Sequence, residues 1–400
     1  MDGGPLLPRR IRAPGASVVA GARLRRWALV AVLAVLAVVA PAVIASRPVS
    51  LGATPPPDEM RARIAGSDRD GWSGYAESGA SLGLPSLGAL SDVTSLLGGT
   101  TRMRAWYAAP DSARVDELSV TGERDRYTTP AGQAVWDYGA NLLTQIRRDP
   151  AVRLPRADDL LPPQLARRLL SGTTPTDPAS ALPPRRVAGV TAAGMRVTVT
   201  DPRTRVGTVD VWADPVSGLP VAVEVTGRGA AGPSLVTRFL ELTQGPPDPA
   251  ALVPRRGPGA GQTSSPTSDL FGVFGRGAPR LVPAVVDGVR REPPQRGFAA
   301  TGKYGTTLSQ LIVVPLPQDV SGTLLGGLSR AGSRARTIDL DAGEGAPDAQ
   351  AAAVESPLLA LAVVRTPARS WAVAGLVTPD VLDRAVRNVA GSVDPPGGQR

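Results

Sequence analysis

The longest uninterrupted apolar stretch of the chain runs from residue 27 to residue 45 and contains no charged side chain. A helix of about 20 apolar residues crosses the roughly 30 Å hydrocarbon core of a bilayer, so this stretch predicts a transmembrane anchor. Arginines gather before it, whereas Arg47 stands alone after it; the upstream set is Arg9, Arg10, Arg12, Arg23, Arg25 and Arg26. This asymmetry predicts a cytoplasmic basic tail over residues 1–26 and an extracytoplasmic location for residues 46–400.

A cleaved signal peptide is the alternative to a retained anchor. Small residues at positions 40–42 or 43–45 would suit a signal peptidase. The apolar run is longer than an ordinary signal core, which favours a single-pass protein of the cell membrane. In both cases the functional part lies outside the cytoplasm.

Beyond a proline-rich tether, short segments of alternating polarity follow one another at intervals of about 8–12 residues, which is typical of an antiparallel sheet. Strands are expected at residues 72–77, 101–107, 113–120, 124–129, 133–138, 186–190, 195–200, 207–213, 219–226 and 235–242, and helices at 58–64 and 158–170. Turn residues separate the strands, and Gly218 is expected to take the positive φ that its reversal requires. Residues 173–184 are expected to be a linker within this region.

Residues 80–99 combine leucines with many glycines and serines and one proline. Such a segment is apolar yet unsuited to regular structure, so we expect a loop that lies over a hydrophobic surface. Its leucines are Leu82, Leu84, Leu87, Leu90, Leu96 and Leu97. It could simply pack on the sheet, or it could act as a lid over a cavity.

A change of composition marks a second region. Residues 246–267 are rich in Gly, Pro, Ser and Thr, which is typical of a domain linker. After them we expect strands at residues 308–316, 334–340, 357–365 and 370–377, helices at 319–331 and 378–390, and a loose loop at 343–353. The predicted organisation is therefore a tail (1–26), an anchor (27–45), a domain of residues 58–245, a linker (246–267) and a small α+β domain of residues 268–392.

Composition narrows the chemistry. The chain has 44 Lys and Arg against 35 Asp and Glu, and it contains no His and no Cys. The basic excess lies largely in the tail, so it indicates orientation rather than nucleic-acid binding. Without Cys there is neither a disulfide nor a lipidated thiol, and without His the commonest general base and metal ligand is missing.

No motif indicates a catalytic, metal or cofactor site. The glycines at 227–232 have dinucleotide spacing but lead into a strand, so no helix terminus is offered to a phosphate. The pairs Asp158/Asp159 and Asp339/Asp341 are expected to be solvated charges, and no Ser-x-x-Lys motif accompanies Lys303, the only lysine. We therefore expect a protein that is not an enzyme and has no cofactor.

Three short motifs carry a family resemblance. They are the hairpin Asp214-Pro-Val-Ser-Gly-Leu-Pro220, the strand Gly132-Gln-Ala-Val-Trp-Asp-Tyr138, and Asp201-Pro-Arg-Thr204 before the hairpin. With them, residues 58–245 resemble the LolA-like and MucB/RseB-like proteins, in their actinobacterial branch. The resemblance implies a curved antiparallel half-barrel around an apolar space with capping helices. It also implies either regulation through an anti-sigma factor or lipid carriage.

A candidate ligand site follows from the aromatic positions. Trp72, Trp106, Trp136 and Trp212 fall on four predicted strands, where they form either the sheet core or the wall of an apolar cavity. Leu82, Leu84, Leu87 and Leu96 would supply its lid.

Two functions fit these features. The first is a membrane-anchored sensor of the MucB/RseB type, which binds a membrane protein such as an anti-sigma factor and also a lipid. The second is a LolA- or LppX-like carrier or holder of a lipid or lipoprotein.

Overall fold

The computed structural model describes residues 54–83, 91–120, 122–147, 153–265, 282–293, 301–330, 335–340 and 348–392, together with Trp27, Leu29 and Val30. The expected anchor, residues 27–45, lies almost wholly outside these residues. In the part of the chain that is described, no helix is both long enough and apolar enough to span a bilayer.

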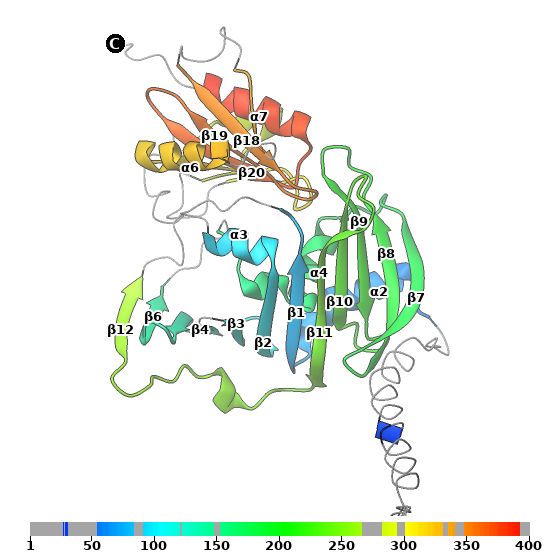
Figure 1. Ribbon diagram of the computed structural model, residues 1–400. Helices are drawn as coiled ribbons and strands as arrows, with labels where there is room; N and C mark the ends of the chain where they lie inside the picture. The colour runs from blue at the N-terminus through cyan, green and yellow to red at the C-terminus, as the bar shows by residue number, and fades with distance from the viewer. Residues whose placement is uncertain are drawn as a thin grey trace, which may run out of the picture. The chain divides into compact units, whose positions relative to one another are not determined.

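A large open sheet, antiparallel except for the parallel pair β6–β12, organises the first part of the chain (Figure 1). Its strand order is β12-β6-β5-β4-β3-β2-β1-β11-β10-β9-β8-β7, so the chain makes one meander to β6 and returns with β11 beside β1. The strands are β1 Trp72–Ala80, β2 Thr100–Ala109, β3 Ser112–Ser119, β4 Gly122–Thr129, β5 Gly132–Asp137, β6 Leu142–Ile146, β7 Ala179–Val187, β8 Val190–Thr198, β9 Val206–Ala213, β10 Pro220–Gly227, β11 Pro233–Gln244 and β12 Gly261–Ser265. The predicted curved, open sheet is confirmed, and the described part of the chain is mostly β with few helices, where an α+β architecture was expected.

The turn between β9 and β10 has the predicted chemistry. The Asp214 carboxylate accepts hydrogen bonds from the backbone N–H groups of Val216 and Ser217, and Gly218 has φ +73°. A Cβ at position 218 would meet the backbone of Arg63, so both the backbone conformation and the space require glycine there.

Two helices fill the inner face of the sheet at the β8–β10 end. They are α2 (Pro57–Gly66), which buries Met60 and Ile64, and α4 (Pro162–Ser171), which buries Leu165 and Leu169. The single helix expected over residues 158–170 is two elements, the 3₁₀ turn η3 (Ala157–Leu160) and α4. Leu161 between them is extended, because Pro162 and Pro163 have no N–H to continue a helix and disfavour a helical residue before them.

Three segments expected to be irregular contain regular elements. The 80–99 segment includes α3 (Ser91–Gly98), a short helix that contacts β1. The expected 173–184 linker runs into β7, an edge strand whose prolines coincide with an irregularity in its pairing to β8. The expected 343–353 loop runs into β18 (Gln350–Glu355).

Residues 245–265, which we call the strap, were expected to be mostly linker. They include the 3₁₀ turn η4 (Pro249–Leu252), which contacts β3 and β4, and they end in β12, which pairs in parallel with β6. Ala260 of the strap packs on a small outer cluster formed by Tyr127, Ala134, Trp136 and Leu143. The strap therefore extends the large sheet and covers part of its outer face.

A second, six-stranded antiparallel sheet follows, with the order β15-β16-β20-β19-β18-β17. Its elements are β15 Gly302–Tyr304, β16 Leu311–Leu316, α6 Gln318–Arg330, β17 Ala335–Thr337, β18 Gln350–Glu355, β19 Ala360–Arg365, β20 Ser370–Gly375 and α7 Pro379–Gly391, preceded by the hairpin β13 Val285–Val286 and β14 Val289–Arg290. The alternation of each strand divides its side chains between two cores: Val364, Trp371 and Val373 pack with α7, whereas Val354 and Val363 pack with α6.

Candidate functional site

An apolar cavity of about 300 Å³ lies between the two sheets. The second sheet contributes the face that α7 leaves uncovered, through Ile312, Val314, Leu316, Ala372 and Ala374. The large sheet and the segments packed on it contribute Leu82, Leu97, Leu165, Leu169, Val206, Val225 and Leu235, and the loops contribute Leu358, Leu359 and Leu376. Val320 and Leu324 of α6 and the charged residues Arg153, Asp159 and Arg168 also line the cavity. Ligand pockets typically have volumes of about 300–1,000 Å³ and mainly apolar linings, so this cavity suits one small apolar ligand.

The loop carrying Asp201-Pro-Arg-Thr204 docks the two sheets at one side of this cavity. Thr204 is fully buried, and its hydroxyl lies within hydrogen-bonding distance of the carbonyl oxygens of Leu308 and Leu376. Backbone bonds flank it: Arg205 N–H donates to Leu376 O at 2.8 Å, and Thr378 N–H donates to Arg203 O at 2.9 Å. Function was not assigned to this motif from sequence, because its partners lie more than 100 residues further along the chain.

An ion-pair network extends this docking. The guanidinium of Arg205 donates to Glu355 at 2.9 Å, and Glu355 also receives Arg336 at 2.7 Å. Both members of the first pair are largely buried, with about a fifth of each side chain exposed. Burial lowers the pKa of Arg205 more than its carboxylate partner raises it. The second sheet is thus attached to the first through specific polar contacts beside an apolar wall.

A smaller pocket of about 160 Å³ adjoins the apolar cavity, since Val93, Leu154 and Pro155 line both. Its polar lining consists of Glu117, Arg124, Arg126, Arg156 and Asp158. By strand alternation, Glu117, Arg124 and Arg126 lie on the inner face of the large sheet with Val115. We call this space the arginine pocket.

The aspartates beside the arginine pocket are not solvated charges as expected. Only 26% of the Asp158 side chain and 16% of the Asp159 side chain are exposed. Burial raises the pKa of Asp158, and the neighbouring Asp159 raises it further. Burial would also raise the pKa of Asp159, but the 2.6 Å bond to Arg153 and nearby charges outweigh it and hold that pKa below its ordinary value. Asp339 is exposed, and Asp341 lies outside the described residues.

The structure separates the predicted site residues. Leu82 lines the apolar cavity, and Leu96 lines the arginine pocket. Leu84 and Leu87 lie outside the described residues. Trp72 is on the inner face, fully buried, with Tyr107 stacked on it at 5.6 Å and Phe239 edge-on at 5.1 Å.

The other three tryptophans lie on the outer face of the large sheet. Trp106 stands opposite Arg114 across the β2–β3 pair, Trp136 opposite Asp125, and Trp212 opposite Ala222. All four tryptophans are described, and none lines the apolar cavity. Successive side chains on a strand point to opposite faces of the sheet, but this rule does not say which face is concave. The sequence therefore could not assign these rings to the inner or the outer face.

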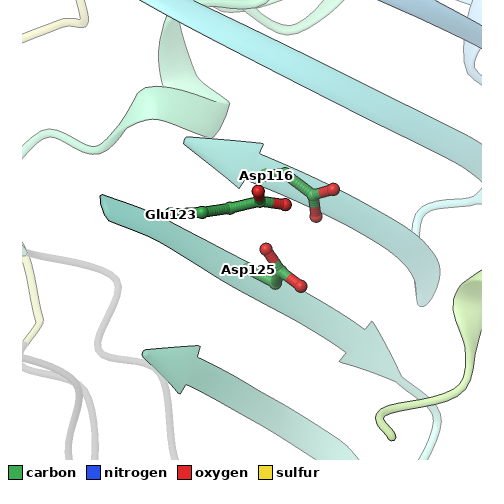
Figure 2. A group of neighbouring side chains, drawn as sticks. All are labelled: Asp116, Glu123 and Asp125. Atoms are coloured by element: carbon green, nitrogen blue, oxygen red, sulfur yellow. The ribbon is translucent and has the colours of Figure 1, made fainter. Parts of the chain in front are cut away.

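A buried acidic group on the outer face was not anticipated from sequence. Asp116 and Asp125 are directly opposed on β3 and β4, and Figure 2 shows their carboxyl groups and that of Glu123 close together. Carboxylate oxygens of the three residues lie within 4.8 Å of one another. The only sequence signal is a set of charged residues alternating along two central strands, which becomes a cluster only once the register is known.

Arg114 neutralises part of this group. Its guanidinium donates to both oxygens of Asp116, at 2.6 and 2.9 Å, and to Asp125 at 2.8 Å, and it lies over the rings of Trp106 and Tyr127. Burial, and then the charge of Asp116, raise the pKa of Asp125 to about 7. The guanidinium thus already binds two of the three carboxylates that a metal ion would need, and we interpret Asp116 and Asp125 as a carboxyl pair held by an arginine.

No protein-family model and no curated protein matches this chain. Among solved structures, a chain of the Pseudomonas aeruginosa MucA/MucB complex is 14% identical with a TM-score of 0.45, over 82% of this chain and 96% of that one. LprF from Mycobacterium bovis is 9% identical (TM-score 0.30; 52% and 100% covered), and the LolA superfamily protein NE2245 from Nitrosomonas europaea is 11% identical (0.21; 49% and 95%). Solved structures similar to this chain thus include MucB and a LolA-superfamily protein.

Proposed function

We propose that this chain is a non-enzymatic, membrane-anchored regulatory protein that holds an apolar ligand between its two sheets and reports its presence to a membrane protein. The observation that carries the proposal is the apolar cavity of about 300 Å³ whose walls come from both sheets. A ligand in this cavity contacts both the large sheet and the second sheet, so its binding free energy depends on how the two sheets are docked. Ligand binding and the docking of the two sheets are therefore linked.

Further features support parts of this proposal. The apolar run with arginines before it supports an anchor with the bulk of the chain outside the cytoplasm. The absence of His and Cys from the sequence is consistent with binding rather than catalysis. The family resemblance of the sequence motifs supports an anti-sigma factor as the membrane partner.

The test of ligand binding uses the full-length protein in nanodiscs and a photoactivatable, alkyne-tagged hexadecanol. We expect labelling of peptides that line the apolar cavity. Ala374→Phe projects a ring from the second sheet into the cavity and should reduce this labelling about tenfold, which corresponds to about 1.4 kcal/mol. Leu240→Phe is the matched control, because Leu240 is exposed on β11. A wild-type protein that is not labelled in the cavity would refute ligand holding.

A carrier function is the second candidate, favoured by the same apolar cavity. Crosslinking in intact membranes followed by mass spectrometry discriminates the two. A regulatory protein should capture one membrane partner stoichiometrically, and that capture should change in Ala374→Phe. A carrier should instead release an extractable acyl ligand to acceptor vesicles and show no such change in capture.

A further inference from the structure

The arginine pocket and the apolar cavity are two parts of one hollow. Val93, Leu154 and Pro155 line both, and consecutive residues of α3 face different parts, with Leu96 in the arginine pocket and Leu97 in the apolar cavity. One side of the joint space is therefore mainly apolar, with Arg153, Asp159 and Arg168 as its charged lining residues, and the other is polar. This is the arrangement that an amphiphile requires.

The polar part carries an excess of positive charge. Arg124, Arg126 and Arg156 line it with two carboxylates, Glu117 and Asp158. Outside the lining, Asp137 pairs with Arg124 at 3.3 Å, and Arg153 and Arg168 share the single carboxylate of Asp159. With these neighbours included, five arginines face four carboxylates. Because the pKa of Asp158 is raised, that carboxyl also holds its proton more readily, which would increase the excess.

Burial strengthens the attraction of this pocket for an anion. The side chains of Arg126 and Arg153 are each only 17% exposed, so their charges act in a medium less polarisable than water. Arg126 and Asp158 lie 3.8 Å apart on the wall of this pocket. A guanidinium has a planar fork of donors that matches carboxylate or phosphate, and Arg124 and Arg126 project from one strand toward the same space.

Resting on the proposed function, we infer that the ligand is an anionic amphiphile, with its chain in the apolar cavity and its carboxylate or phosphate headgroup in the arginine pocket against Arg124 and Arg126. The headgroup exchanges its hydration for these guanidinium groups, and the chain leaves water for the wall formed by both sheets. An uncharged amphiphile with a chain of the same length gains only the free energy of burying that chain. The protein should therefore prefer the charged amphiphile.

The experiment compares three photoactivatable, alkyne-tagged probes on the full-length protein in phosphatidylcholine nanodiscs: palmitic acid, hexadecyl phosphate and hexadecanol. We expect the wild-type protein to label with at least one anionic probe about tenfold more than with hexadecanol at equal concentration. The acid and phosphate arms then distinguish a fatty acid from a phosphate-bearing lipid. Arg124→Gln and Arg126→Gln should each remove most of this preference while leaving labelling by hexadecanol unchanged. Arg238→Gln, at an exposed position on β11, should leave the preference intact.

Each outcome has a distinct consequence. Equal labelling by all three probes would overturn the headgroup site and leave the proposed apolar ligand standing. No labelling of the cavity by any of the three probes would overturn the proposed function itself. A preference that survives both substitutions would place the headgroup elsewhere and also refute the inference. Labelling by hexadecanol serves as the folding control for each variant, and Arg126→Lys, which retains the charge, should recover part of the preference.

Discussion

The two ends of the large sheet differ in what their inner faces carry. At the β8–β10 end the inner positions are apolar and buried, and include Met195, Val197, Val209, Val211 and Val223, with α2 and α4 packed nearby. At the β3–β5 end the inner face includes Glu117, Arg124 and Arg126 instead, and it lines the arginine pocket. The same meander thus builds a filled end and an open end.

The difference shows how one sheet can be both scaffold and binding surface. An amphipathic helix gains free energy by covering β-branched side chains, so the filled end is closed by α2 and α4. A helix packed on the charged inner face would remove the guanidinium and carboxylate groups there from their remaining contact with water. Burying such charges without new partners costs free energy. The space therefore remains where the inner face is charged. Stability should depend on the filled end, and binding on the open end.

The largest expected effect compares a tryptophan on the outer face of each end, Trp212 at the filled end and Trp106 at the open end. Trp212 is 2% exposed, donates its indole N–H to Pro183 O at 3.0 Å, and lies beneath the guanidinium of Arg185. Trp212→Ala should lower the free energy of unfolding by about 3–5 kcal/mol. Trp106→Ala, at a half-buried position of the open end, should lower it much less. Urea denaturation of both variants measures the contrast, and equal losses would show that stability does not depend more on the filled end than on the open end.

The second effect concerns pH and the outer face of the open end. Asp125 has a pKa of about 7 in the folded protein, against about 3.9 in an unfolded chain. Between these values the folded state holds a proton that the unfolded state has released, so Asp125 lowers stability progressively as the pH rises from about 4 to about 7. Asp125→Asn should remove this fall and raise the free energy of unfolding at pH 8 by about 2 kcal/mol.

The control for this experiment has the opposite sign. The pKa of Asp137 is lowered, mainly by a hydrogen bond from the backbone of Ala140, so Asp137→Asn should reduce stability above pH 4. Unfolding curves collected between pH 4 and pH 8 measure both variants. An Asp125→Asn protein with the pH dependence of the wild type would show that the carboxyl pair does not titrate in this range.

The third effect tests the lid expected from sequence. Leu84 and Leu87 lie outside the described residues, so this remains a prediction. If they close over the cavity, Leu84→Ser with Leu87→Ser should weaken binding of a fluorescent fatty-acid probe about tenfold, or about 1.4 kcal/mol. The melting temperature should change little. A lowered melting temperature with unchanged binding per folded molecule would assign them to packing instead.

The smallest effect tests the docking that completes the cavity. Thr204→Val keeps the shape of the side chain but removes the hydroxyl, which leaves the buried carbonyl of Leu308 without this donor. We expect a loss of about 1 kcal/mol and faster hydrogen exchange around residues 305–310 and 376–378. Thr204→Ser retains the hydroxyl and should preserve most of the protection. Unchanged exchange in Thr204→Val would mean that this contact does not hold the sheets together.

Much of this protein is determined locally by its sequence. Turn residues at regular intervals predict the antiparallel meander, because Gly and Pro set backbone angles within a few residues. Gly218 takes its predicted conformation for that reason. The amphipathic pattern of residues 378–390 likewise predicts α7, whose Leu382, Ala385, Val386 and Val389 are buried as expected.

The candidate site depends on contacts that no local pattern contains. The cavity has walls from segments such as Val206 and Val314, more than 100 residues apart, and Thr204 finds its acceptors only after both sheets have formed. The faces of Trp106, Trp136 and Trp212 depend on curvature, and the Asp116–Asp125 pair on register. Local pattern therefore determined which residues form strands, whereas tertiary structure decided which side chains meet, because alternation alone does not specify which face of a sheet becomes concave.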